Sequence, residues 1–424
     1  MKYRKMGSLD WDVSALGFGC MRLPTSGLRN KVDEKCAIEI IREGIDLGIN
    51  YLDTAWPYHE GTSEVILGNA LKDGYREKVH VATKLPTFLV KTEKDFDTFL
   101  NNQLKRLQLD CMDVYLFHCL NKTEFEKIKR LNLIDKMEKA KAEGKIRHIG
   151  FSFHDIFPVL KEIVDYYRWD LGQIQYNYMD TEIQATTDGL KYLHEKGIAP
   201  VIMEPVKGGL LANPPKEVLC ILKNAENQRT PVDWALQFLW DRPEVSVVLS
   251  GMSSRQQVVE NCASADRSGV NSLTQNDHVM FKEIAGVLRR GMLVPCTGCG
   301  YCEPCPAGVS IPYNFALANN MLAGSNSVMD IVFRWQLKHN YKGLAQSKEE
   351  RERTGKEGSS LLCVECGACI PKCPQSINIP EELKKVNDVI SKQKITVKEI
   401  FQMLLYAVRN WRLVLSRVMR RGSS

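Results

Sequence analysis

Two repeating patterns of apolar and polar residues alternate along the first 290 residues of the chain. Short apolar runs that end at Gly, Pro or polar residues are typical of buried strands. Longer stretches with apolar residues three and four positions apart are typical of helices packed on one side. Strands are expected at 13–19, 50–55, 79–84, 113–118, 146–151, 173–178, 199–205 and 245–250, each followed by a helix. This alternation predicts an α/β fold whose eight parallel strands close into a (β/α)8 TIM barrel.

Polar residues stand at or just beyond the carboxyl ends of three successive expected strands. Asp53 lies near the end of the second strand, Tyr58 follows it on a loop, Lys84 ends the third and His118 ends the fourth. In a parallel α/β barrel, this rim carries the chemistry. A single residue of any of these types is more often structural, but four residues that converge on one rim predict a shared site.

These four residues and the phrase LDTAxxYxxGxSE at 52–64 resemble the aldo-keto reductase family. The resemblance extends over about residues 1–290 and implies an NAD(P)H-dependent oxidoreductase that interconverts a carbonyl and an alcohol. It implies that Tyr58 donates the proton and that Lys84, held charged by Asp53, makes the phenol more acidic. It also implies that His118 donates a hydrogen bond to the oxygen of a small carbonyl substrate.

The resemblance further implies a nicotinamide dinucleotide at the same rim. Ser152 and Gln173 match residues that hold the nicotinamide amide, although the usual Asn beside Ser152 is replaced by Phe153 or His154, and Gln173 could equally make an internal barrel hydrogen bond. Many relatives bind the 2′-phosphate of NADP with a Lys and an Arg, and only Arg255 is present here, so NAD fits at least as well as NADP. The expected cofactor contacts are Gly19, Met21, Ser152, Gln173, Pro205, Gly208, Gly209, Leu210, Gly251, Ser253, Arg255, Gln257, Glu260 and Asn261.

Eight of the 14 cysteines form two runs after residue 290, C-x2-C-x2-C-x2-C-P and C-x2-C-x2-C-x3-C-P. The second is the bacterial ferredoxin pattern. Zinc sites usually close with paired C-x2-C spacings, so the runs favour [4Fe-4S] clusters, and their number indicates two. In two-cluster ferredoxins the fourth cysteine of each run ligates the other cluster. One cluster is therefore expected on Cys296, Cys299, Cys302 and Cys373, and the other on Cys363, Cys366, Cys369 and Cys305.

The chain is therefore expected to contain three regions: the barrel at 1–290, a mostly helical ferredoxin-like domain at 291–391, and a basic amphipathic helix at 392–424. Within the second domain, 348–360 is expected to be a solvated loop. The last region holds eight Lys or Arg residues against Glu399 alone, so the rest of the chain is near neutral and no general nucleic-acid binder is indicated. We expect that helix to pack on its own domain. The alternative is contact with a membrane surface or with an acidic ferredoxin or flavodoxin.

The absence of a signal-peptide pattern and of a long apolar run predicts a cytoplasmic protein without a membrane span. A functional difficulty remains, because nicotinamide transfers two electrons as hydride, whereas clusters transfer one at a time. Coupling normally needs a flavin or a radical substrate. The clusters could pass electrons to or from a partner, or could be structural or redox-sensing beside an ordinary reductase. The alternative is an electron-transfer or redox-sensing module whose barrel binds a flavin or no longer turns over nicotinamide.

Overall fold

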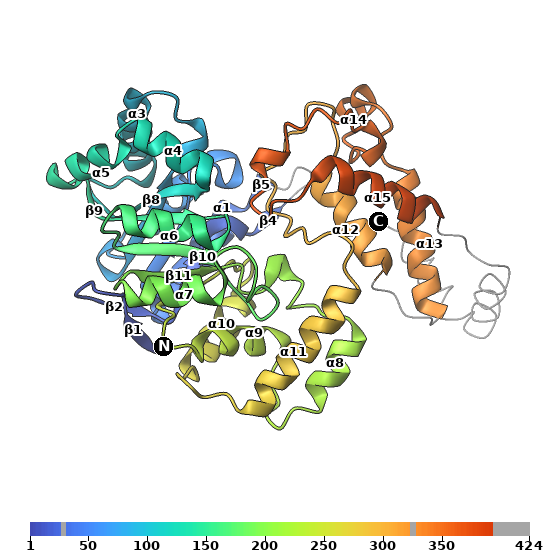
Figure 1. Cartoon of the computed structure of the whole chain (residues 1–424), viewed down its shortest axis with the longest axis horizontal. Coiled ribbons are helices and arrows are strands. Elements are labelled where there is room, and N and C mark those ends of the chain that lie inside the picture. The colour runs from blue at the N-terminus through green and yellow to red at the C-terminus, as the bar shows by residue number, and fades with distance from the viewer. Residues whose placement is uncertain (27–30, 323–327, 393–424) are drawn as a thin grey trace. The chain divides into compact units, whose positions relative to one another are not determined.

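The computed structural model describes residues 1–26, 31–322 and 328–392 (Figure 1). The described chain divides into two compact units. The first contains Met1–Pro214 and Leu219–Ala285, and the second begins at Gly286 and also includes Pro215–Val218. The expected basic helix at 392–424 lies almost entirely outside the described residues. Among the described helices, none combines the length and the apolar character needed to cross a bilayer.

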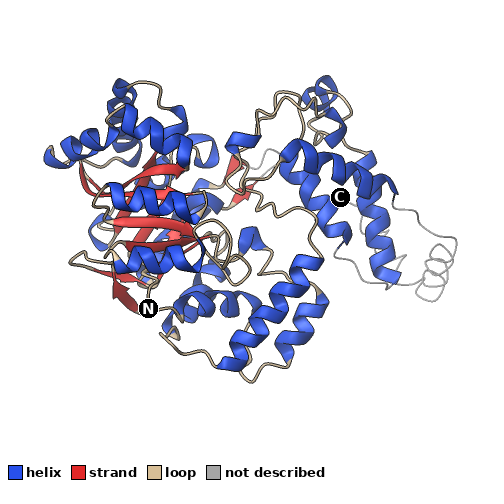
Figure 2. Cartoon of the chain, viewed as in Figure 1, coloured by secondary structure: helices blue, strands red, loops and turns tan. Residues whose placement is uncertain are grey.

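The first unit is a closed barrel of parallel strands surrounded by helices, as the sequence predicts (Figure 2). Around the barrel the strands follow the order β10-β11-β12-β3-β6-β7-β8-β9, so that neighbours in sequence are neighbours in space. The strands are β3 (Leu16–Gly19), β6 (Tyr51–Asp53), β7 (His80–Leu85), β8 (Met112–Leu120), β9 (Ile146–Phe153), β10 (Leu171–Gln175), β11 (Ala199–Met203) and β12 (Val247–Ser250).

The helices of this unit follow the expected alternation, with one break. The helix expected after the strand at 113–118 is interrupted at Asn132, whose φ of 49° is left-handed, so α4 ends before it and α5 begins after it. The helices are α1 (Glu34–Asp46), α2 (Ser63–Ala70), α3 (Glu93–Leu107), α4 (Lys122–Arg130), α5 (Leu133–Ala142), α6 (Phe157–Tyr166), α7 (Thr186–Glu195), α9 (Pro231–Trp240) and α10 (Arg255–Asp266). Two more, α8 (Lys216–Lys223) and α11 (Gln275–Arg290), belong partly to this unit and partly to the second.

The first expected strand, at 13–19, is wrong in extent. Its first half is β2 (Asp12–Ser14), which pairs antiparallel with β1 (Tyr3–Lys5), and only its second half enters the barrel as β3. Met6, in the turn of this hairpin, is fully buried and belongs to the same apolar cluster as the inward-facing Tyr51 and Val114. The hairpin therefore contributes to the barrel core. A second short pair, β4 (Thr25–Ser26) and β5 (Lys31–Val32), follows β3.

The second unit is mostly helical, with α12 (Ile311–Leu322), α13 (Val328–Lys342), α14 (Lys348–Thr354) and α15 (Ile379–Lys392). Its core contains Phe315 from α12 and Val386 from α15, and several cysteines pack against it. The expected loop at 348–360 is partly wrong, because Ser347 accepts the N–H of Glu350 and caps α14.

Two glycines allow a close backbone approach in the second unit. A Cβ at Gly358 would lie 1.9 Å from the Gly308 carbonyl oxygen, so this position cannot hold a side chain without a shift. The segment that leads to the second cysteine run is thereby fixed beside the end of the first.

Candidate active site

The four residues expected at the rim lie together. Lys84 Nζ donates to Asp53 Oδ1 at 2.6 Å and to the Thr54 carbonyl at 2.8 Å, and it lies 5.1 Å from the centre of the Tyr58 ring. A side-chain hydrogen bond joins Lys84 to Tyr58. The rings of Tyr58 and His118 meet edge to face, with centroids 6.1 Å apart. The phenol, the ammonium, the carboxylate and the imidazole therefore form one group.

Burial decides the charge states of these groups. Lys84 is 1% exposed, and its burial acts to lower its pKa, but Asp53 and Tyr58 outweigh this effect and hold the pKa above the ordinary lysine value. Lys84 is therefore an ammonium ion at neutral pH. Burial, with the charge of Lys84 and nearby His154, holds the pKa of His118 well below its usual range. His118 is therefore a neutral imidazole, which can donate one hydrogen bond.

A second buried network supports the end of β7. The carboxylate of Glu64, fully buried at the start of α2, accepts hydrogen bonds from Thr83 Oγ1 at 2.7 Å and from Gln103 Nε2 at 2.6 Å. Gln103 also donates to the carbonyl of Lys84 at 3.0 Å. The network fixes the backbone that carries Lys84. Glu64 is not among the residues expected in the site, although it ends the phrase at 52–64.

The ends of β9 and β10 present groups that suit a carboxamide. Ser152 Oγ accepts the N–H of Cys119 at 2.8 Å, and a hydrogen bond from Gln173 reaches Asp53. This contact agrees with an internal hydrogen bond of Gln173, and its contact with a cofactor stays a prediction. Its Oε1 and the Nδ1 of His154 are buried and have no partner within the described part of the chain. Burial lowers the pKa of His154 to about 4, against the effect of a hydrogen bond with Gln184. These orphaned atoms fit the amide of a nicotinamide ring.

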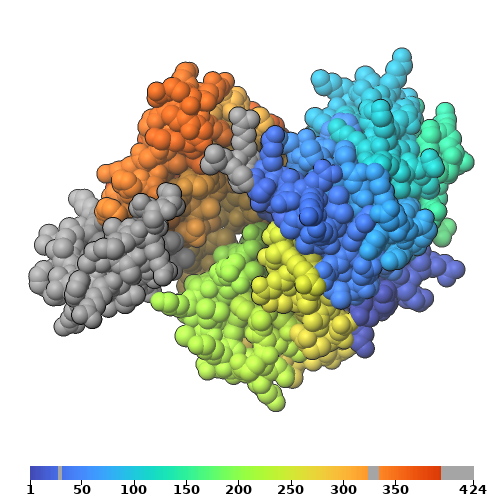
Figure 3. Space-filling model, turned by 180° about the vertical axis from the view of Figure 1, so that it is seen from behind, coloured from blue at the N-terminus to red at the C-terminus, as the bar shows by residue number. Residues whose placement is uncertain are grey.

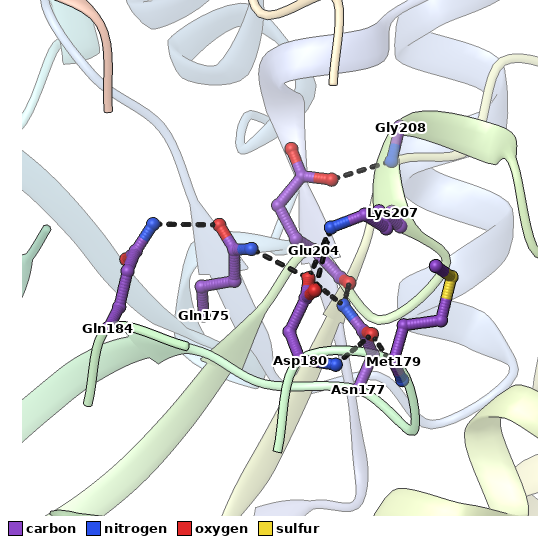
Figure 4. A network of polar contacts seen from close by, with 8 residues as sticks. All are labelled: Gln175, Asn177, Met179, Asp180, Gln184, Glu204, Lys207 and Gly208. Carbon is purple, nitrogen blue, oxygen red and sulfur yellow. Dashed lines mark hydrogen bonds and ion pairs between the residues drawn. The ribbon is translucent and has the colours of Figure 1, made fainter. Parts of the chain in front are cut away.

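A polar network that no sequence pattern indicates joins the loop after β10 to the turn after β11 (Figure 4). Lys207 Nζ lies 2.7 Å from both carboxylate oxygens of Asp180, and the two side chains are 4% and 1% exposed. Asp180 also accepts from Gln175 Nε2 at 2.8 Å and from Asn177 Nδ2 at 3.0 Å. In the sequence, Asp180 and Lys207 are 27 positions apart, so no local pattern could have identified them as a pair.

Eight of the other expected cofactor contacts lie at neighbouring strand ends. Pro205, Gly208, Gly209 and Leu210 are on the turn after β11, Gly251 and Ser253 follow β12, and Gly19 and Met21 are at the end of β3 and just beyond it. Backbone φ values of 63° at Gly208 and 99° at Gly209 need glycine. A Cβ at Gly251 would lie 2.8 Å from Arg22 Cγ, so the first carbons of the Arg22 side chain pack against this loop.

The remaining expected contacts on α10 already have protein partners. Arg255 forms a two-point ion pair with Glu43 of α1, at 2.7 and 3.0 Å, and Figure 3 shows the yellow segment containing α10 beside the blue segment containing α1. Gln257 Oε1 accepts the N–H of Ser253 at 2.8 Å. Asn261, which is buried, donates to Ser250, whereas Glu260 is exposed and bonds Gln256 in its own helix.

The cysteines of the second unit gather in two groups. A small cavity is lined by Cys296, Cys299 and Cys302 of the first run and by Cys373 of the second, with Ile311, Phe315 and Ile377 as apolar walls. The thiol of Cys369 is influenced electrostatically by Cys305, Cys363 and Cys366. Among the described side chains no three potential ligands meet as a single-ion site would require. Each group contains three cysteines of one run and the fourth of the other, which fits the crossed ligation of two clusters.

Comparison with known proteins agrees with this division of the chain. Residues 15–284 match the model of the Aldo/keto reductase family, and residues 295–379 match a 4Fe-4S dicluster domain. L-galactose dehydrogenase of Arabidopsis thaliana is 33% identical over 291 residues, covering 62% of this chain and 88% of that protein. The NADH-specific methylglyoxal reductase of Escherichia coli is 27% identical over 339 residues, covering 68% of this chain and all of that protein.

A solved structure gives the same picture. The holo form of aldo-keto reductase AKR11C1 from Bacillus halodurans superposes with a TM-score of 0.57 and is 30% identical, covering 67% of this chain and 96% of that one. The similarity to each of these relatives covers about two thirds of the chain, and the dicluster match accounts for a region beyond the family match.

Proposed function

The chain belongs to the aldo/keto reductase family of oxidoreductases, and from that premise we propose that its barrel reduces a small carbonyl compound with NAD(P)H, or runs the reverse oxidation of an alcohol. The observation that carries the proposal is the buried ammonium of Lys84 between Asp53 and Tyr58. A phenol is too weak an acid at neutral pH to donate its proton readily unless a nearby cation stabilises the phenolate.

The chain's own residues then have defined tasks. A bound nicotinamide supplies the hydride to the carbonyl carbon. Tyr58 donates its proton to the oxygen on which negative charge develops, and Lys84 stabilises the phenolate that results. Neutral His118 donates a hydrogen bond to the same oxygen and holds it near the phenol. Asp53 keeps Lys84 charged and in place.

The cofactor would lie along the barrel rim, from Ser152, His154 and Gln173 at the nicotinamide end to the turn at Gly208 and Gly209. The orphaned Oε1 of Gln173 and Nδ1 of His154 fit the carboxamide. Because Arg255 is already paired with Glu43, we propose that the 2′-phosphate of NADP gains little here and that NADH is used at least as well.

We further propose two [4Fe-4S] clusters in the second unit, ligated in the crossed manner, that exchange single electrons with a partner such as a ferredoxin or flavodoxin. The mixed composition of both cysteine groups supports this proposal. The iron content is expected to be about eight per chain, because each cluster holds four irons. A content near four would mean one cluster and would refute the two-cluster proposal.

Tyr58→Phe tests the reductase proposal. The variant should lose NAD(P)H-dependent reduction across a carbonyl panel, measured anaerobically on iron–sulfur-loaded protein, while its cluster spectra stay unchanged. Tyr192→Phe is the matched control, because Tyr192 is a phenol that bonds Asp165 on the outside of the barrel. Absence of activity in both the wild type and the variant would refute the reductase proposal and favour an electron-transfer or redox-sensing module, with or without a flavin.

A further inference from the structure

Glu204 lies on the turn that carries two of the expected cofactor contacts, Gly208 and Gly209. Glu204 follows the last residue of β11, and its Oε2 accepts the N–H of Gly208 at 2.6 Å. In Figure 4 its carboxylate points toward Gly208. Its backbone φ of 58° is left-handed, which is strained for a residue other than glycine. Strain of this kind is concentrated at functional sites.

The place of this turn in the barrel indicates an anion site. β11 and β12 are the seventh and eighth strands of the closed sheet, and the loops after these two strands commonly form the phosphate site of barrel enzymes. Backbone N–H groups on a turn with left-handed residues attract anions. A Cβ added at Gly209 would meet no atom within 4 Å, so the turn borders open space.

The cations at this edge already have acidic neighbours. Lys207 is paired with Asp180, and Arg255 is paired with Glu43. The charge of Arg22 acts on Glu204 itself. A phosphate at this turn would therefore find these cations already neutralised by carboxylates. It would also find the Gly208 N–H already bonded to the carboxylate of Glu204.

We propose that Glu204 occupies the position of a cofactor phosphate in the free protein, and that its carboxylate must leave the Gly208 N–H before a dinucleotide binds. Glu204 thereby sets the affinity of the dinucleotide site, and this inference rests on the proposed function. Only the side chain has to move, because the Glu204 carbonyl is held by Asn177 Nδ2 at 3.0 Å.

The same geometry makes binding depend on pH. Burial raises the pKa of Glu204, while Arg22, the Gly208 N–H and Lys207 act to lower it and Asp180 acts to raise it further. A protonated carboxyl group accepts a hydrogen bond more weakly and repels no phosphate. Dinucleotide affinity should therefore rise as pH falls through the pKa of Glu204.

Calorimetric titration of iron–sulfur-loaded protein with NADH and with NADPH tests the inference. Glu204→Gly removes the carboxylate and suits the left-handed backbone, and it should lower the Kd for the dinucleotide by at least about tenfold, the equivalent of one charged hydrogen bond. Glu204→Gln keeps the shape without the charge and should give a smaller gain in the same direction. Both variants should lose the rise in affinity at low pH.

The control is Asp95→Asn. Asp95 also accepts backbone N–H groups, those of Lys91 and Thr92 at 2.8 Å, but it lies at the start of α3, which follows β7, four strands round the barrel from β11. If the wild type binds a dinucleotide and neither Glu204 variant binds it more tightly than Asp95→Asn does, the inference is refuted and the dinucleotide site stands. If no form binds NADH or NADPH, the proposed function fails and the inference fails with it.

Discussion

Replacing Asp53 by Asn should destabilise the barrel in a way that depends on pH. The variant keeps the shape of the side chain but leaves the ammonium of Lys84, which is 1% exposed, with neutral acceptors such as the Thr54 carbonyl at 2.8 Å. Breaking one partner from a buried ion pair costs about 3–5 kcal/mol. We expect the free energy of unfolding of the barrel to fall by that amount near neutral pH.

The pH dependence follows from the pKa of Lys84. In the wild type this pKa is raised in the folded state, so the stabilisation is fully present below the ordinary lysine pKa and is lost only as pH rises through the folded value. In Asp53→Asn the effect of burial is opposed less strongly, so the pKa of Lys84 should fall below its ordinary value. Above the pKa of Asp53, which burial raises, the deficit in stability should then shrink as pH rises toward the ordinary lysine pKa, so it should be larger at about pH 6 than at about pH 9.

Urea unfolding of the wild type, Asp53→Asn, Lys84→Met and the double variant, followed by tryptophan fluorescence at about pH 6 and about pH 9, measures these differences. The double variant should be more stable than the sum of the two single losses predicts, because it leaves no buried charge unpaired. An Asp53→Asn protein within about 1 kcal/mol of the wild type at both pH values would refute the reasoning, since that is the cost of losing an exposed pair.

Three further predictions concern the same barrel. Lys207→Met should cost about 3–5 kcal/mol in urea unfolding because it leaves Asp180 buried and unpaired, and adding Asp180→Asn should restore part of the loss; equal stability of Lys207→Met and wild type would contradict this. His118→Ala should lower kcat by about 100- to 1,000-fold in steady-state carbonyl reduction, and His118→Gln, which keeps a donor, should retain more activity. Arg255→Ala should change the free energy of unfolding by less than about 1 kcal/mol, because its pair with Glu43 is exposed. It should also leave the ratio of NADPH to NADH affinity in calorimetric titration nearly unchanged. A large loss of NADPH affinity alone would show that Arg255 binds the 2′-phosphate.

The barrel could be predicted because periodic patterns report on burial, and eight strand–helix repeats permit few topologies. The hairpin of β1 and β2 could not be predicted, because Val13 and Ser14 lead directly into the apolar run of β3. Only their pairing with Tyr3–Lys5 separates β2 from β3. The break at Asn132 and the cap at Ser347 each depend on a single residue. A periodic pattern is read over many residues and does not show such local features.

The candidate site divides in the same way. Asp53, Tyr58, Lys84 and His118 could be identified because each lies at or near a strand end, and the closed sheet brings those ends together. The pair of Asp180 and Lys207 could not, because neither residue stands in a recognisable pattern and their contact exists only once β10 and β11 are adjacent. Likewise, the partner of Arg255 is Glu43, which lies more than 200 positions earlier in the chain.

The cavity that joins Cys373 to the first cysteine run has a consequence for biosynthesis. Until the ribosome reaches Cys363, the first run has only three of the thiols that line its cavity. The other cysteines of the group that contains Cys305 are then also absent. With the crossed ligation proposed above, neither cluster could be completed before the second cysteine run has been made. On that proposal, iron and sulfide would be delivered only after Cys373 has been made, and a chain terminated before Cys363 should carry an intact barrel but no stable iron–sulfur chromophore.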